Sequence, residues 1–296
     1  MTRNAALTFT PTIHKDIYPA INPTIQPSLS HSGRSILVTG AGRGIGRSIA
    51  LRYAEASPST LILAARTSSE LDVTEAEILA LNLTSPPTIV KLVLDVTDGK
   101  AVARAASTIK NDIGRLDVLI NNAGYSPEWA PIADGDPEDY WRTWEVNLKG
   151  VYLVLHAFLP LLTETHEKTG ALVHVLNVSS IGAIVCIAGA SAYETSKLAV
   201  VRLTQFVQTE YGAKGVLATS VHPGGVLTEL SRNVKEIQPF LTDSPNLAGG
   251  FFVWLTSQPR TWLGGRFVSV AWDVEELESK KDEIVEGDKL KADVRF

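Results

Sequence analysis

Tyr193 and Lys197 are the two residues of this chain whose types and spacing most directly suggest chemistry. They stand four positions apart in the run SAYETSK, which reads as helix, so the two side chains share one helix face. An ammonium group beside a phenol stabilises the phenolate and lowers the pKa of the phenol from its reference value of about 10. A tyrosine in that setting can donate or accept a proton near neutral pH, although many helices carry the same pair without any activity.

A glycine-rich turn, TGAGRGIG at residues 39–46, lies upstream of this pair. It follows an expected strand at 35–39 and opens an expected helix at 44–55, which is the context that a dinucleotide-binding turn requires. Glycine lets the backbone approach a pyrophosphate, and the helix N-terminus favours negative charge there. A plain structural turn is the alternative. With the tyrosine and lysine, the turn predicts hydride chemistry on a nucleotide cofactor bound by Gly40, Arg43, Gly44, Ile45 and Gly46.

The residues after the second expected strand, 61–65, bear on the choice of cofactor. An acidic residue about 20 positions beyond the glycines binds the ribose 2′-hydroxyl of NAD, but Ala65 stands there. Arg66 follows, and Arg43 lies inside the glycine turn, so two guanidinium groups can flank a 2′-phosphate, with Thr67 adding a hydroxyl donor. This predicts a preference for NADP(H) over NAD(H). Alternatively, Arg66 is a surface arginine that stacks on adenine, and either cofactor fits.

Apolar strand-like segments alternate with helical segments along most of the chain, which predicts a parallel sheet covered by helices on both faces. We therefore expect one doubly wound, Rossmann-type α/β domain with a seven-stranded sheet at residues 34–273. Residues 1–33 carry four prolines and no sustained period, so they predict an irregular arm that lies on the surface or is partly disordered. The charged residues 274–296 predict a solvated helix that is not a binding module. The expected strands are 35–39, 61–65, 88–94, 118–121, 172–178, 217–222 and 267–270.

Composition sets further bounds. The 296 residues are 45% hydrophobic, which is ample for a globular core, and the net charge of −5 without a basic run argues against a nucleic-acid surface. Cys186 is the only cysteine, so no internal disulfide is possible, and the histidines show no metal-ligand spacing. The start lacks the apolar core of a secretory signal, and no apolar run reaches about 18 residues. We expect a cytoplasmic protein without a metal site or a membrane span.

Further motifs follow in order between residues 35 and 272. They are Asp95 after the third strand, the run NNAG at 121–124, Asn147 in WEVNLKG, Ser180 in NVSSIG, and Pro223, Gly224 and Thr228 in HPGGVLT. With the glycine turn and YETSK, they resemble the short-chain dehydrogenase/reductase family, which uses a single Rossmann domain. The tail, GGRFVSVAWDVEEL, departs from the commoner family ending. With the Pro-rich arm, it resembles a subgroup of fungal members, several of which act in secondary metabolism.

The resemblance implies a role for each of four catalytic residues. Ser180 would hydrogen-bond the carbonyl or alkoxide oxygen of the substrate, and Tyr193 would pass a proton to or from that oxygen. Lys197 would lower the pKa of Tyr193 and bind the nicotinamide ribose. Asn147 would hold a water molecule that links Lys197 to solvent.

The resemblance also implies the remaining contacts with the cofactor. Asp95 would accept a hydrogen bond from the adenine amino group, and Val226 and Thr228 would hold the nicotinamide carboxamide. Alternatively, Asp95 is only a turn residue, and Thr228 only a helix cap. The other residues expected near the cofactor are Val96, Asn122, Ala123, Gly124, Pro223 and Gly224, with Tyr193 and Lys197 at the ribose.

The expected activity is the NADP(H)-dependent interconversion of a secondary alcohol and a ketone. Segments 126–134, 181–190 and 227–242 would form the substrate region, and their few charges suit an apolar small molecule, for example a terpenoid or a polyketide. The alternative is a catalytically silent NADP-binding redox sensor, although such sensors usually lack the intact tyrosine and lysine. Family members commonly pair through two helices, here 136–162 and 192–211, so we expect a homodimer or a homotetramer.

Overall fold

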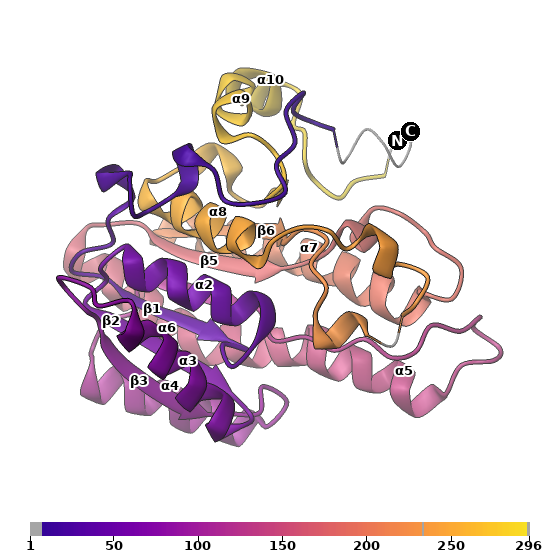
Figure 1. The fold of residues 1–296 in the computed structure, drawn as a ribbon, viewed down its shortest axis with the longest axis horizontal. Coiled ribbons are helices and arrows are strands. Elements are labelled where there is room, and N and C mark those ends of the chain that lie inside the picture. Colours follow the sequence, from indigo (N-terminus) through magenta and orange to yellow (C-terminus); the bar gives the residue numbers. More distant parts are fainter. Residues whose placement is uncertain (1–7, 233, 295–296) are drawn as a thin grey trace.

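A seven-stranded parallel sheet forms the centre of the structure, a computed structural model that describes residues 8–232 and 234–294 (Figure 1). The strand order is β3-β2-β1-β4-β5-β6-β7, so the expected doubly wound Rossmann fold is confirmed. Each strand end lies within one residue of its expected position. The strands are β1 Ser35–Thr39, β2 Thr60–Ala65, β3 Thr88–Val93, β4 Val118–Asn121, β5 Val173–Val178, β6 Val216–His222 and β7 Phe267–Ser269.

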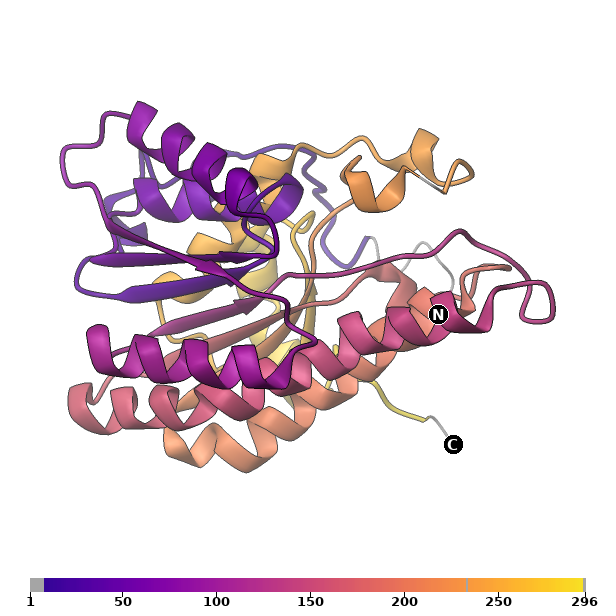
Figure 2. The ribbon, with the colours of Figure 1, turned by 90° about the horizontal axis from the view of Figure 1, so that it is seen from below.

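The helices divide between the two faces of the sheet, as Figure 2 shows. One face carries α2 Gly44–Glu55, α3 Ser68–Ala80 and α8 Pro245–Ser257. The opposite face carries α4 Gly99–Asp112, α6 Gly150–Thr169 and α7 Ser191–Tyr211. A separate apolar core fills the space on each side, which is why the central strands are buried along their whole length.

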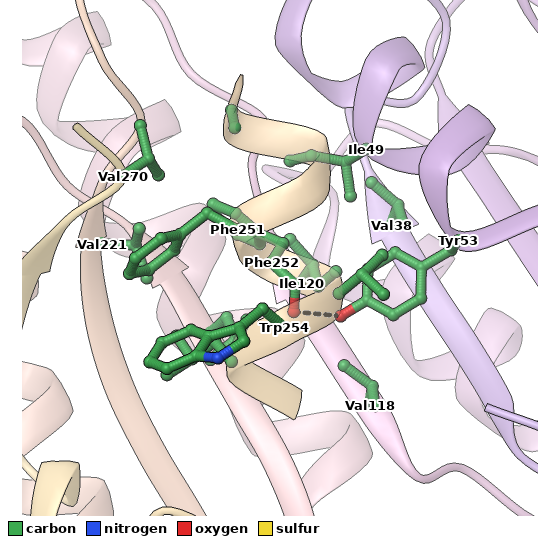
Figure 3. Packing of buried hydrophobic residues seen from close by; sticks show 14 of the residues in the cluster. Val38, Ile49, Tyr53, Val118, Ile120, Val221, Phe251, Phe252, Trp254 and Val270 are labelled. Carbon is green, nitrogen blue, oxygen red and sulfur yellow. Dashed lines mark hydrogen bonds between the residues drawn. The ribbon is translucent and has the colours of Figure 1, made fainter. Parts of the chain in front are cut away.

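The core beneath α8 holds the helix that follows the glycine turn. Phe251, Phe252 and Trp254 of α8 pack in one cluster with Val38 of β1 (Figure 3). The hydroxyl of Tyr53, which is fully buried in α2, donates a hydrogen bond to the Phe252 carbonyl oxygen at 3.0 Å. A buried hydroxyl without a partner would be costly in this apolar surrounding. This contact therefore fixes α2 against α8, and with it the turn at the start of α2.

The expected helix 136–162 is longer than predicted and is interrupted. α5 Pro137–Trp144 begins after Asp136, whose carboxylate accepts a hydrogen bond from the Glu138 amide at 2.9 Å. A π-helical turn, Glu145–Lys149, joins α5 to α6. The run Pro137–Thr169 is long and apolar enough to cross a membrane by length and composition, which corrects the expectation that no segment would meet this criterion. Half of the most apolar 18-residue stretch of this run is buried inside the fold. A buried core helix meets the same criterion of length and composition.

Both terminal segments pack onto the domain, which corrects the expectation of a surface or disordered arm for residues 8–33. The expected solvated helix of the tail is confirmed, except that some of its side chains are buried. In the arm, Ile21 of η1 Pro19–Ile21 and Leu29 of η2 Pro27–Leu29 are buried in the core beside α8. The tail forms α9 Val274–Ser279 and α10 Lys281–Glu286, which bury Leu277 and Ile284 in the same core. Arm and tail meet in Figure 1, and Ile13 in the arm pairs with Trp272 in an antiparallel bridge.

Candidate active site

The predicted site residues lie at the carboxyl ends of neighbouring strands or on the helices that face them. Because the strands are parallel, these ends meet at one edge of the sheet, where open α/β sheets bind ligands. The winding reverses between β1 and β4, which places the switch point beside the glycine turn. Residues 40–46 follow β1, Arg66 and Thr67 follow β2, Asp95 and Val96 follow β3, Asn122, Ala123 and Gly124 follow β4, Ser180 follows β5, and Pro223, Gly224, Val226 and Thr228 follow β6.

The glycine turn is packed so tightly that a side chain at Gly46 cannot be accommodated. A Cβ there would lie 2.1 Å from the Gly40 carbonyl oxygen and 2.5 Å from Asn122 Nδ2. The Thr39 hydroxyl accepts hydrogen bonds from the Asn122 and Ala123 amides at 3.0 and 3.1 Å, which ties the turn to the end of β4. The bare backbone at the start of α2 therefore fits a pyrophosphate, as the sequence predicts.

Arg43 in the glycine turn is paired with a carboxylate that the sequence does not predict at the site. Its Nη1 lies 3.2 Å from Oε1 of Glu70, in the first turn of α3. Thr67 and Glu70 form the TxxE pattern of a capping box, but Thr67 makes no side-chain cap, and the glutamate turns toward Arg43 instead. Arg43 therefore has a competing acidic partner, whereas Arg66 is exposed at the end of β2.

Asp95 closes a tight turn after β3. Its Oδ1 accepts hydrogen bonds from the amide and the hydroxyl of Thr97 at 2.9 and 2.7 Å. Burial raises the pKa of Asp95, but the bonds from Thr97 and the charges of Arg66 and Arg142 outweigh it, so the pKa lies below its usual value. The turn role is thus observed. The bond to the adenine amino group stays a prediction that an ionised carboxylate at this strand end supports.

Tyr193 and Lys197 share one face of α7, as their spacing predicts, and lie close to Ser180. The Lys197 Nζ lies over the Tyr193 ring, 5.7 Å from its centroid, and donates a hydrogen bond to the Val178 carbonyl oxygen at 3.0 Å. Burial raises the pKa of Tyr193 and outweighs the lowering by the Ser180 hydroxyl, and the Glu194 carboxylate raises it further, while burial lowers the pKa of Lys197 to about 8. The pKa of Tyr193 thus lies above its usual value in this structure, and the lowering by Lys197 stays a prediction.

Asn147 is fully buried in the π-helical turn, a feature that frequently marks functional sites. Its Oδ1 accepts a hydrogen bond from the Tyr125 amide at 2.8 Å, and its Nδ2 donates to the Tyr125 carbonyl oxygen at 2.9 Å and the Ser196 hydroxyl at 3.0 Å. A Cβ at Gly124 would lie 3.5 Å from Asn147 Oδ1 and 3.7 Å from Lys197 Nζ. Asn147 therefore fixes the segment after β4 beside the lysine, and its role toward water stays a prediction.

The expected substrate segment 181–190 begins directly after Ser180. The Ser180 Oγ accepts a hydrogen bond from the Gly182 amide, and Nδ1 of His222 accepts one from the Ile181 amide, both at 3.1 Å. Burial lowers the pKa of His222 to about 4, so the imidazole is neutral at pH 7 and carries its proton on Nε2. His222 is not among the predicted residues, because its contact with Ile181 joins segments that are far apart in the sequence.

The third expected substrate segment, 227–242, is described except for residue 233 and is closed at a narrow neck. At the neck, Asp243 Oδ2 accepts a hydrogen bond from the Gly225 amide at 2.7 Å, and the Asp243 amide donates to the Gly225 carbonyl oxygen at 2.9 Å. Thr228 lies against Gly44, which has a φ of +56° and whose Cβ position lies 3.3 Å from Thr228 Cγ2. Thr228 also precedes a short 3₁₀ turn, its amide donating to the Ser231 hydroxyl at 3.0 Å.

Segments 126–134 and 181–190 extend beyond the same end of the sheet (Figure 2). Segment 126–134 is joined to segment 181–190 by the Ala130 amide, which donates to the Gly189 carbonyl oxygen at 3.2 Å. Within residues 8–232 and 234–294, no group of three or more His, Cys, Asp or Glu side chains is arranged to hold a metal ion. The predicted cofactor-binding and catalytic residues therefore gather at one edge of the sheet and are flanked by the three expected substrate segments.

Comparisons with known proteins agree with this geometry. The profile of the short chain dehydrogenase family matches residues 34–239. The short chain dehydrogenase mpl6 of Monascus purpureus is 47% identical over 98% of this chain and 97% of its own length, and andI of Emericella variicolor is 39% identical over 95% and 94%. A solved short chain dehydrogenase from Shigella flexneri 2a, complexed with NADP, is 25% identical with a TM-score of 0.73 over 83% of this chain and 99% of its own.

The fungal relatives align with almost the whole chain, including most of the arm and the tail, whereas the family profile begins at residue 34. The expected resemblance to fungal members is therefore confirmed. Both the profile and the relatives cover the segments that carry the glycine turn, Ser180, Tyr193 and Lys197. This chain belongs to the short-chain dehydrogenase/reductase family.

Proposed function

We propose that this protein is an NADP(H)-dependent oxidoreductase that interconverts a secondary alcohol and a ketone on a mainly apolar small molecule. The observation that carries the proposal is the convergence of Ser180, Tyr193 and Lys197 at the sheet edge that also holds the glycine turn. A hydroxyl, a phenol and an ammonium group in this arrangement can bind a substrate oxygen and move a proton to or from it. A redox sensor without chemistry would not need all three.

Tyr193 is the residue proposed to transfer a proton to or from the substrate oxygen. The Ser180 Oγ accepts a hydrogen bond from the Gly182 amide, so its own O–H is available for donation to the substrate oxygen. The raised pKa of Tyr193 keeps the phenol protonated at pH 7, which is the form that donates a proton to an alkoxide during reduction. Lys197, with a pKa of about 8, is mostly protonated at that pH and would bind the ribose hydroxyls. The nicotinamide supplies or accepts the hydride when it is bound.

The proposed preference for NADP(H) rests on Arg66. Among the described residues Arg66 forms no ion pair, so its guanidinium is available for a 2′-phosphate, whereas Arg43 already faces Glu70. Ala65, where a carboxylate would repel the phosphate, gives no such repulsion. The related structure from Shigella flexneri 2a is complexed with NADP, which supports the same cofactor here.

The proposed substrate class rests on apolar side chains around the catalytic residues. Each of the three substrate segments exposes at least one large apolar side chain, namely Ile132, Ile184, Leu227 and Phe240. Apolar surface gathered around a reactive group is typical of a binding site for an apolar ligand. Because the relatives mpl6 and andI are fungal proteins, we propose a fungal secondary metabolite as substrate, such as a terpenoid or a polyketide. We also propose a cytoplasmic location.

Purified protein tests the proposal directly. NADPH oxidation is measured with a panel of apolar ketones of increasing ring number, and NADP reduction with the matching secondary alcohols. We expect turnover with at least one pair, and comparison of metabolites from a wild-type and a deletion strain identifies the natural one. Tight NADPH binding without turnover on any ketone or alcohol would favour the redox-sensor alternative.

We also propose that two or four copies assemble through the outer face of α5, α6 and α7. Within the helices expected to pair, the apolar residues Val154, Phe158 and Val200 are buried against the sheet. The apolar side chains exposed on this face are Trp141, Tyr152, Leu198 and Phe206. A hollow of about 460 Å³ lies on the same face, lined by Trp141, Trp144, Glu145, Leu148, Lys149, Tyr152 and Leu203. None of these residues is catalytic, so the hollow fits a partner helix better than the substrate.

The variant Phe206→Glu is expected to separate the assembly into monomers at micromolar concentration, because a charged side chain would replace an apolar one and lose its hydration at the interface. Light scattering measures the mass. The control Leu79→Glu changes an exposed apolar residue on α3 and should leave the mass unchanged. A monomeric wild type at the same concentration would contradict the proposed assembly.

A further inference from the structure

Glu194 is a buried carboxylate in the middle of the active-site helix. It stands between Tyr193 and Lys197 on α7, and only 7% of its surface is exposed. A buried carboxylate is costly unless hydrogen-bonded donors surround it. One such donor is the Ile187 amide, which lies 2.9 Å from Glu194 Oε2. Glu194 therefore contacts the segment that carries the substrate side chains. Its charge also contributes to the raised pKa of the neighbouring Tyr193.

The fit between Glu194 and this segment depends on a glycine. A Cβ at Gly182 would lie 3.0 Å from Glu194 Cγ and 3.4 Å from Oε1, so the glutamate side chain lies directly against Gly182. The Glu194 amide also donates to the Ala190 carbonyl oxygen at 2.9 Å, which starts α7. Glu194 thus touches the beginning, the middle and the end of segment 181–190.

The other links of this segment lie at its two ends. At the start, the Ile181 amide is bound by His222, and at the end the Gly189 carbonyl oxygen is bound by the Ala130 amide. Between them, Ile184 is exposed and Ile187 is partly exposed. The bond from the Ile187 amide to Glu194 therefore ties the middle of the segment to the helix that carries Tyr193.

We infer that Glu194 is a positioning residue that holds segment 181–190 at a fixed distance from Ser180 and Tyr193 and thereby sets the fit of the substrate. The inference rests on the proposed function for its effect on catalysis. A carboxylate suits this task because hydrogen bonds to an ionised acceptor are short and strong. Loss of the side chain would release the loop without removing any group that touches the reacting atoms.

Two substitutions separate this role from a general loss of structure. Glu194→Ala removes the acceptor and should raise KM for the ketone by about tenfold or more, with a smaller change in kcat and an unchanged dissociation constant for NADPH. Glu194→Gln keeps an oxygen at the same reach and should restore KM to within about threefold of wild type. Glu210→Ala, an exposed glutamate near the end of the same helix, is the matched control and should behave as wild type.

Hydrogen exchange tests the same contact without turnover. Amides of residues 183–189 should exchange faster in Glu194→Ala than in wild type, and at the wild-type rate in Glu194→Gln and Glu210→Ala. The exchange measurement does not need turnover, so failure of the inference and failure of the proposed function are distinguishable. Unchanged exchange in Glu194→Ala, or equal losses in the Ala and Gln variants, would overturn the inference.

Discussion

Replacement of Tyr193 by phenylalanine is expected to lower kcat for ketone reduction by at least about 10²-fold, the usual contribution of a positioned acid–base group. Burial raises the pKa of the Tyr193 phenol, which keeps it protonated as a donor at neutral pH. Phenylalanine retains the ring over which Lys197 lies and removes only the hydroxyl. Folding and the dissociation constant for NADPH should therefore remain close to wild type.

The control for this variant is Tyr211→Phe, which removes a hydroxyl from the last turn of the same helix. It should leave kcat unchanged. Circular dichroism and NADPH titration establish that both variants are folded and bind the cofactor. Turnover of Tyr193→Phe within a few-fold of wild type would show that another group transfers the proton.

Replacement of Arg66 by alanine is expected to weaken NADP(H) selectively. A hydrogen bond to a charged group contributes roughly 1.5–3 kcal/mol, so the loss corresponds to about a ten- to hundredfold rise in KM for NADPH, while KM for NADH changes little. The phosphate carries close to two negative charges near neutral pH, and Arg66 lies exposed at the end of β2. Steady-state kinetics with both cofactors measure the ratio.

Two further variants sharpen this prediction. Glu70→Gln removes the carboxylate beside Arg43 and should improve NADPH binding, because Arg43 then faces the phosphate without an acidic competitor. Arg104→Ala, which removes an exposed arginine from α4, is the matched control and should leave both KM values unchanged. Equal or better kcat/KM with NADH than with NADPH in the wild type would contradict the proposed preference and leave the fold and the catalytic residues untouched.

The sheet and its edge could be predicted because their signals are local. Each strand is a short apolar run between turn residues, and the glycine turn marks both the end of β1 and the start of α2. The spacing of Tyr193 and Lys197 likewise places them on one face of α7.

The remaining features depend on contacts between distant segments. The arm reads as irregular because its prolines interrupt any period, yet Ile21 and Leu29 complete the core next to α8. The pairing of Arg43 with Glu70 joins the ends of two different strands, and the orientation of Lys197 depends on the Val178 carbonyl oxygen. Backbone acceptors and cross-strand partners leave no pattern in the sequence, so propensity and spacing do not predict them.

The transfer of the hydride itself tests the central claim most directly. Wild-type protein is incubated with an apolar ketone and NADPH deuterated at the transferred position of the nicotinamide ring, and the product is analysed by mass spectrometry. The proposed function predicts one deuterium on the carbinol carbon of each alcohol formed, with one NADPH consumed per alcohol and at least about 10²-fold less product in the same time from Tyr193→Phe. Bound NADPH that is never consumed with any ketone, or an alcohol without the label, would contradict it.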